Sequence, residues 1–317
     1  MKMTRKLVMA AAALAALSLS ADTYTWASGS GGDYETLSNW TILSTGQAPT
    51  SLPGSGDKVV LPNAAASYGV TNSTTFTIGE LVMGGGTDAG HPTFEFANGT
   101  TTNEVLGDVT IKSGAVLTHF PNGAAPCTYR LALKVGGDMT VESGGLVDVN
   151  GKGYTGKNGP GASNGTVGGA YASLGNGQSG DTRCYGSIRN PSDPGSGNGY
   201  ADGVNVNAQA GGGVVHLDVA GDLVVNGTIR SRHRSGKGDY GAAASGSIAI
   251  CADSVTGSGS ISVNNTGGSY KRNGGSGRVS IVQREATSLA FSNIDISGAG
   301  GGTLYVENRW QHLPNVL

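Results

Sequence analysis

The chain has 317 residues, of which only 13% are charged, and its formal charge of −2 becomes −5 without the three basic residues of its first 21 positions. A mildly acidic chain has no general attraction for nucleic acid or anionic lipid, so no nucleic-acid partner is expected. Glycine accounts for 56 residues, well above the usual share. Apolar β-branched residues recur between the glycines in short alternating runs, which predicts many short strands and tight turns.

Residues 1–21 predict a secretory signal peptide. A positive start, an apolar run and a small-residue cleavage site follow one another at Lys2–Lys6, Leu7–Leu17 and Ser18–Ala21. The alternative, an uncleaved membrane anchor, needs a longer apolar run to cross roughly 30 Å of hydrocarbon. No later segment approaches the length of a membrane span. The mature chain is therefore expected to be secreted, extracellular or on the outer cell surface, with no transmembrane segment.

Residues 22–62 predict an N-terminal cap that leads into the first clear strand. Bulky side chains gather here, at Trp26, Tyr34, Leu37 and Trp40. The end of a stacked β-structure otherwise exposes its core and its strand edges. Turn residues from Pro53 to Asp57 then precede the strand Val59–Leu61.

Repeated patterns are the most informative feature of the remaining chain, 63–317. Four segments share two small residues, a glycine and then alternating apolar positions, at 211–217, 244–250, 275–281 and 300–306. Their glycines are 33, 31 and 25 residues apart. Self-similarity at such a period predicts stacked units. A second pattern places Gly-Asp before a short strand at Asp108, Asp138 and Asp222, and these aspartates are interpreted first as corner formers.

The repeats predict an all-β fold, a single-stranded right-handed parallel β-helix with about three strands per turn. Each turn would pair with its neighbours and bury one apolar row. In the segment that follows Gly213, Val215, Leu217 and Val219 would point inward, and His216 and Asp218 outward. Almost no helix is expected. The competing fold is a sandwich or barrel of hairpins, which would show turn signals every 8–12 residues without a longer repeat.

Residues 150–213 interrupt the pattern as a glycine-rich lateral insertion. Eleven glycines occur within 151–180, with almost no alternation of apolar residues. The segment is either an excursion from one corner or a series of tight glycine turns on the side of the helix. It is interpreted as an ordered flap over one face, held by tyrosines at Tyr154, Tyr171, Tyr185 and Tyr200.

Two motifs carry a family resemblance. Trp26, Asn39-Trp40 and Pro53–Leu61 resemble the opening of bacterial secreted and autotransporter-type passenger proteins, and Leu146–Tyr154 resembles the start of the glycine-rich block in large bacterial β-helix surface proteins. The resemblance implies a β-helix used for surface display, adhesion or glycan contact. The chain departs from autotransporters because Trp310–Leu317 forms no strand series of a membrane barrel.

Arg230, Arg232 and Arg234 are the candidate ligand-binding residues. In a strand they share one face, where their guanidinium groups could hold an anionic glycan through paired hydrogen bonds. His233 and Lys237 belong to the same cluster, and the alternative is a solvated basic loop.

The sequence shows no catalytic or metal motif, so no cofactor and no metal are expected. Cys127, Cys184 and Cys251 have no metal-ligand spacing and are interpreted as buried small residues with at most one disulfide. The predicted function is a structural, adhesin-like or glycan-contacting role, toward an extracellular polysaccharide or a host or matrix surface. The alternative is a polysaccharide lyase or glycoside hydrolase, with outward acids at Glu142, Asp148 and Asp218.

Overall fold

A computed structural model describes residues 21–124, 126–163, 167–177, 183–199, 210–234, 242–265, 273–284 and 289–309. The predicted signal peptide lies outside the described residues, except for Ala21. In the described parts the regular elements are strands and short 3-10 segments, such as η1 (Leu37–Asn39) and η5 (Phe291–Asn293). The all-β prediction is confirmed. Within these residues no helix has the length and apolar character needed to cross a membrane.

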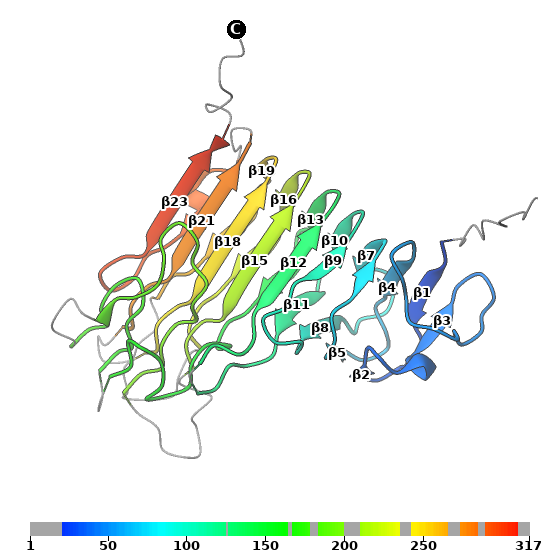
Figure 1. Ribbon diagram of the computed structural model, residues 1–317, viewed down its shortest axis with the longest axis horizontal. Coiled ribbons are helices and arrows are strands. Elements are labelled where there is room, and N and C mark those ends of the chain that lie inside the picture. Colours follow the sequence, from blue (N-terminus) through cyan, green and yellow to red (C-terminus); the bar gives the residue numbers. More distant parts are fainter. Residues whose placement is uncertain are drawn as a thin grey trace, which may run out of the picture.

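The strands form three sheets that run along the long axis of the molecule (Figure 1). Sheet I contains β1 (Thr23–Trp26), β3 (Trp40–Ile42), β4 (Lys58–Leu61), β7 (Glu80–Met83), β10 (Val109–Ile111), β13 (Met139–Val141), β16 (Leu223–Val225) and β19 (Val255–Thr256). Sheet II contains β2 (Gly32–Asp33), β5 (Tyr68–Asn72), β8 (Pro92–Phe96), β11 (Val116–His119), β14 (Leu146–Asp148), β17 (Thr228–Arg230), β20 (Ser260–Ser262) and β22 (Ile294–Asp295). Sheet III contains β6 (Thr77–Ile78), β9 (Asn103–Val105), β12 (Leu131–Val135), β15 (Val214–Val219), β18 (Ser247–Ala252), β21 (Arg278–Gln283) and β23 (Thr303–Asn308).

From β4 to β21 the chain visits sheets I, II and III in turn, so that each circuit adds one strand to every sheet. Each strand pairs in parallel with the strand of the next circuit, as β4 does with β7 and β12 with β15. Among the described strand pairs only β1 and β3 are antiparallel. This pairing is incompatible with hairpin-linked sheets, and the hairpin alternative is wrong.

Apolar side chains at alternate positions form continuous inward rows. In sheet III the row Leu131, Val215, Ile248 and Val279 follows the strand register, and each of these side chains is buried. Sheet I has the equivalent row Val59, Leu81, Val109, Met139, Leu223 and Val255. Burial of each such side chain stabilises the fold by about 1.5–3 kcal/mol relative to exposure. The predicted inward direction of Val215, Leu217 and Val219 is confirmed.

The Gly-Asp corners form a ladder of hydrogen bonds between circuits. The Asp138 backbone N–H donates to Asp108 Oδ1 at 2.9 Å, and the Asp222 N–H donates to Asp138 Oδ1 at 2.8 Å. The next circuit continues the ladder, because the Ser254 hydroxyl donates to Asp222 Oδ1. The carboxylates thus satisfy corner N–H groups that no strand pairs, and the interpretation of these aspartates as corner formers is confirmed.

The N-terminal end of the stack is closed by aromatic packing and by an antiparallel strand. Trp26 and Trp40 are buried edge to face, with ring centroids 4.9 Å apart, and Tyr34 packs on Trp40 at 5.1 Å. Strand β3 turns back along β1 and ends sheet I. Sequence patterns missed the strands before Val59, and Leu37 is half-buried in η1 rather than part of the core.

The glycine-rich insertion leaves the stack after β14 and returns at β15, and its described residues form no strand. Residues 189–193 cross the outer face of sheet III through side-chain contacts. Ser280 Oγ donates to the Arg189 carbonyl at 2.7 Å, and Ser247 Oγ donates to the Asp193 carbonyl at 2.6 Å. Tyr171 anchors the insertion through a 2.6 Å hydrogen bond to Ser247, whereas Tyr200 lies outside the described residues.

Candidate functional site

A groove of about 620 Å³ crosses the outer face of sheet III beside the insertion. Strands β12, β15, β18 and β21 supply its floor, residues 189–190 of the insertion border one side, and Arg309 lies at the far end. We call it the sheet III groove. Its lining residues are Thr100, Thr102, Arg130, Ala132, Leu133, Lys134, Arg189, Asn190, His216, Leu217, Asp218, Ala249, Ile250, Cys251, Ser280, Val282 and Arg309.

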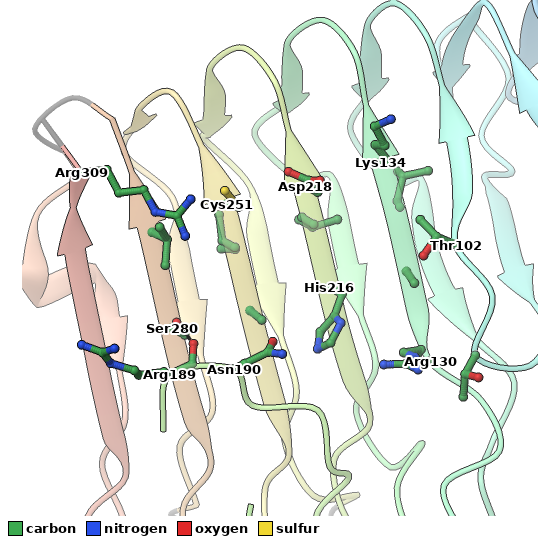
Figure 2. A pocket seen from close by; sticks show the side chains of 17 residues that line it. Thr102, Arg130, Lys134, Arg189, Asn190, His216, Asp218, Cys251, Ser280 and Arg309 are labelled. Carbon is green, nitrogen blue, oxygen red and sulfur yellow. Dashed lines mark hydrogen bonds between the residues drawn. The ribbon is translucent and has the colours of Figure 1, made fainter. Parts of the chain in front are cut away.

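Outward residues of paired strands form two rows on the groove floor. The register aligns the first row as Ala132, His216, Ala249 and Ser280, and the second as Lys134, Asp218, Cys251 and Val282. Figure 2 shows Lys134, Asp218, Cys251 and Arg309 toward one end of the strands, with Arg130, His216, Asn190 and Arg189 toward the other. The small side chain of Ala249 leaves room at the centre of the floor. His216 and Asp218 share this face, as their spacing predicts.

His216 ties the floor of the groove to the insertion. Its Nε2–H donates to the Pro191 carbonyl at 2.9 Å. The pKa of His216 is lowered, chiefly by burial and to a smaller extent by the charge of Arg130, although the bond to Pro191 opposes the shift. A neutral imidazole therefore holds the groove wall in place.

Cationic side chains dominate the lining of the groove. The lining has four cations, at Arg130, Lys134, Arg189 and Arg309, and one carboxylate, that of Asp218. Lys134 is held by Glu104 at 2.7 Å, and Arg309 lies 3.7 Å from Glu307. Among the described residues no carboxylate lies within ion-pair distance of Arg130 or Arg189.

Arg130 and Arg189 are positioned by different parts of the chain. Arg130 directly precedes β12, and its Nε is buried without a hydrogen-bond partner. Arg230 Nε on sheet II is also buried and unpaired, but Arg230 has Asp148 as an ionic partner. Arg189 belongs to the insertion, where its guanidinium lies over the Tyr305 ring at 5.2 Å from the centroid. Two arginines whose charge is not cancelled thus face one groove from opposite sides.

The arginines predicted from sequence, Arg230, Arg232 and Arg234, lie elsewhere, at the outer face of sheet II. Burial alternates from 230 to 234, with the arginines on the outer side. Arg230 Nη2 pairs with Asp148 Oδ2 at 2.6 Å. Arg234 borders a smaller hollow of about 160 Å³.

Arg232 also has an acidic neighbour. The pKa of Asp295 is lowered, although burial opposes the shift, because Ser297, Asn264 and more weakly Arg232 stabilise its carboxylate. The structure therefore brings the three arginines to one face but places carboxylates beside two of them. This arginine cluster, the densest group of charges in the sequence, is therefore partly neutralised by Asp148 and Asp295.

The outward acids named for catalysis do not gather. Asp218 lies in the sheet III groove, whereas Asp148 lies on sheet II and is already paired with Arg230. Glu142 follows β13 at a corner of the stack. Among the residues that the structure describes, no three Asp, Glu, His or Cys side chains come together in a group that could hold a metal ion.

Cys127, Cys184 and Cys251 are half-buried thiols, so their interpretation as buried small residues is wrong in degree. Cys251 lines the groove beside Asp218, and its pKa is raised, first by burial and then by the charge of Asp218. A raised pKa keeps the thiol protonated and unreactive.

Sequence patterns missed the groove because no local motif marks it. Arg130 and Arg189 stand alone in their segments, and Arg309 follows the last strand. The one available indication was the alternation of side chains along the strands. Lys134 and Asp218 occupy outward positions of strands that carry inward apolar residues. Comparisons with protein-family models, with curated proteins and with solved structures find no match to this chain.

Proposed function

We propose that this chain is a secreted or cell-surface protein, a right-handed parallel β-helix, that contacts an extracellular glycan through the sheet III groove without catalysing a reaction. The observation that carries the proposal is the groove itself, about 620 Å³ across the strands of successive circuits. A polymer lying across the strands would meet a new set of side chains on each circuit, at intervals of about 4.8 Å.

The lining suits a ligand rich in hydroxyl groups. Arg130, Asn190 and Asp218 bring polar side chains to the lining from three separate segments of chain. Polar groups placed on a rigid scaffold fix the orientation of a bound ligand and give specificity. The floor is rigid because its strands are paired in register and packed on buried apolar rows.

Binding is favoured over hydrolysis because the groove lining has a single carboxylate. Glycosidases commonly use two carboxyl groups that flank the scissile bond. Here Asp218 is the one carboxylate of the lining, and the outward acid Asp148 is engaged on another sheet. This distribution supports a site that contacts a glycan through its floor and walls.

The proposal predicts that filling the groove abolishes glycan binding. Ala249→Trp places an indole at the centre of the floor, and Thr140→Trp is the matched control because Thr140 faces outward on sheet I. Affinity electrophoresis against a panel of polysaccharides should show retention of the unmodified protein and of Thr140→Trp, and loss of retention for Ala249→Trp. Equal retention of both variants would place the site elsewhere, and no retention on any polysaccharide would contradict glycan contact.

The same samples test for catalysis. New reducing ends, or ultraviolet absorbance from an unsaturated sugar, would contradict a non-catalytic role and favour a hydrolase or a lyase. Circular dichroism of both tryptophan variants should match that of the unmodified protein, because each new side chain points out of the stack.

A further inference from the structure

We infer that the glycan bound in the sheet III groove is an acidic polysaccharide, held across the strands by Arg130 and Arg189. The inference rests on the proposed glycan contact and adds the chemical class of the ligand. It starts from the imbalance of charge: the mature chain is acidic as a whole, yet the groove lining has four cations and one carboxylate. A concave surface lined by one sign of charge concentrates ligands of the opposite sign.

The two arginines differ from the other cations of the groove in that they have no acidic neighbour within ion-pair distance among the described residues. Lys134 and Arg309 have acidic neighbours in Glu104 and Glu307. Arg130 has no carboxylate within ion-pair distance in the part of the chain that the structure describes, and Arg189 contacts the uncharged side chain of Tyr305. A guanidinium presents parallel N–H donors that match the two oxygens of a carboxylate or sulfate group. An acidic sugar would give the Arg130 guanidinium the anionic partner that it does not have among the described residues.

The separation of these arginines implies a polymer rather than a single sugar. Arg130 precedes β12, and Arg189 stacks on Tyr305 of β23. Strands β12 and β23 are four strand spacings apart in sheet III, or about 19 Å. Asn190 lies between the two arginines, where its amide would meet ring hydroxyls (Figure 2). The bound chain would therefore span several sugars, with acidic groups near both ends.

Polygalacturonate and its carboxyl-reduced, neutral counterpart test the inference, because they share one backbone and differ at C6, where a carboxylate is replaced by a hydroxymethyl group. The unmodified protein should bind the acidic polymer, and binding should weaken as salt is raised. Equal retention of the two polymers would overturn the inference while leaving the proposed glycan contact intact, and retention of neither would overturn both. Dextran sulfate beside dextran distinguishes the source of the charge: retention of both acidic polymers supports recognition of anionic sugars in general, and retention of polygalacturonate alone supports recognition of carboxylates.

A pair of double variants locates the contact. Arg130→Gln with Arg189→Gln should weaken binding of polygalacturonate about tenfold or more for each arginine, since hydrogen bonds to charged groups contribute about 1.5–3 kcal/mol. The control, Arg232→Gln with Arg234→Gln, removes the same number of charges from sheet II and should bind like the unmodified protein. The reverse result would overturn the assignment and move the contact to the arginines of sheet II. Matching thermal unfolding curves would show that each variant is folded.

Discussion

At the scale of single residues, His119 shows how one side chain fixes the path of the chain around the insertion. Its Nδ1–H donates to the Phe120 carbonyl at 2.7 Å, and its Nε2 accepts the Val214 N–H at 3.1 Å, where the chain re-enters sheet III. A Cβ on Gly213 would collide with the ring of His119, so that position requires glycine. No sequence pattern relates His119 to Val214, because the two residues are 95 positions apart.

Burial of His119 predicts a stability that depends on pH. Burial lowers the pKa of His119 to about 3, the bond to Phe120 opposes the shift, and Lys152 adds to it weakly. Below about pH 6.5 the unfolded chain binds a proton at this residue and the folded chain does not. The free energy of unfolding therefore falls as pH drops from 6.5 toward 3, by about 1.4 kcal/mol per pH unit from this group.

His119→Gln isolates this contribution. The variant should be less stable than the unmodified protein at pH 8, and the difference should narrow as pH falls, measured by urea unfolding at a series of pH values. A difference that stays constant from pH 7 to pH 4 would contradict the buried neutral imidazole. NMR titration of the His119 ring in the unmodified protein is the second measurement, and it should show no protonation near pH 6.

At the scale of elements, glycine lets extended segments of the insertion pack backbone against backbone. The Gly153 N–H donates to the Gly211 carbonyl at 2.7 Å, and the Gly195 N–H donates to the Gly212 carbonyl at 2.9 Å. The Gly212 N–H in turn donates to the Ala244 carbonyl at 3.0 Å, and this bond joins the insertion to the segment before β18. These segments bury their backbone polar groups without forming regular strands, which is why alternation of apolar residues is missing there.

Gly211→Ala should destabilise the protein strongly. A Cβ at Gly211 would fall on the carbonyl of Gly195, and neither backbone can move without breaking its hydrogen bonds. We expect a loss of about 3 kcal/mol, the upper part of the range for overpacking. Gly56→Ala is the control, because nothing lies within 4 Å of its Cβ position. Chemical denaturation should leave Gly56→Ala within about 0.5 kcal/mol of the unmodified protein, and a similar change for both would contradict this account.

At the scale of the whole molecule, stability comes from rows of side chains that each contact the circuit before and the circuit after. Ile248 of β18 is fully buried between Val215 and Val279. Leu304 continues the same row in β23, the last described strand of sheet III, and remains half-buried. The N-terminal end, in contrast, is closed by Trp26, Trp40 and β3.

Position along the stack therefore predicts the effect of a core truncation. Ile248→Ala should cost about 2–5 kcal/mol, because it leaves a cavity between two circuits. Leu304→Ala should cost less than half as much, because its side chain is covered by one circuit and partly exposed. Both values come from urea unfolding of the purified variants. Equal losses would mean that the end of the row is as well covered as its middle.

Local patterns were enough to predict the repeated strands, the inward rows and the Gly-Asp corners, but not the strands before Val59, because alternation and corner chemistry depend on neighbouring residues. Val215 and Leu217 point inward, and Asp138 lies at a corner, as their sequence context predicts. The sequence also brought Arg230, Arg232 and Arg234 to one face. It could not show that Asp148, 82 residues earlier, pairs with Arg230.

Only the tertiary structure decided where a binding surface could lie. Arg130, Arg189 and Arg309 come from the lead-in to β12, from the insertion and from the residue after β23, and no sequence spacing relates them. They line one groove because parallel stacking aligns strands of different circuits, and because the insertion returns across sheet III through Ser247 and Ser280. Which face of a strand a side chain occupies follows from its position among adjacent residues. A groove, in contrast, depends on the register of segments that are far apart in the chain.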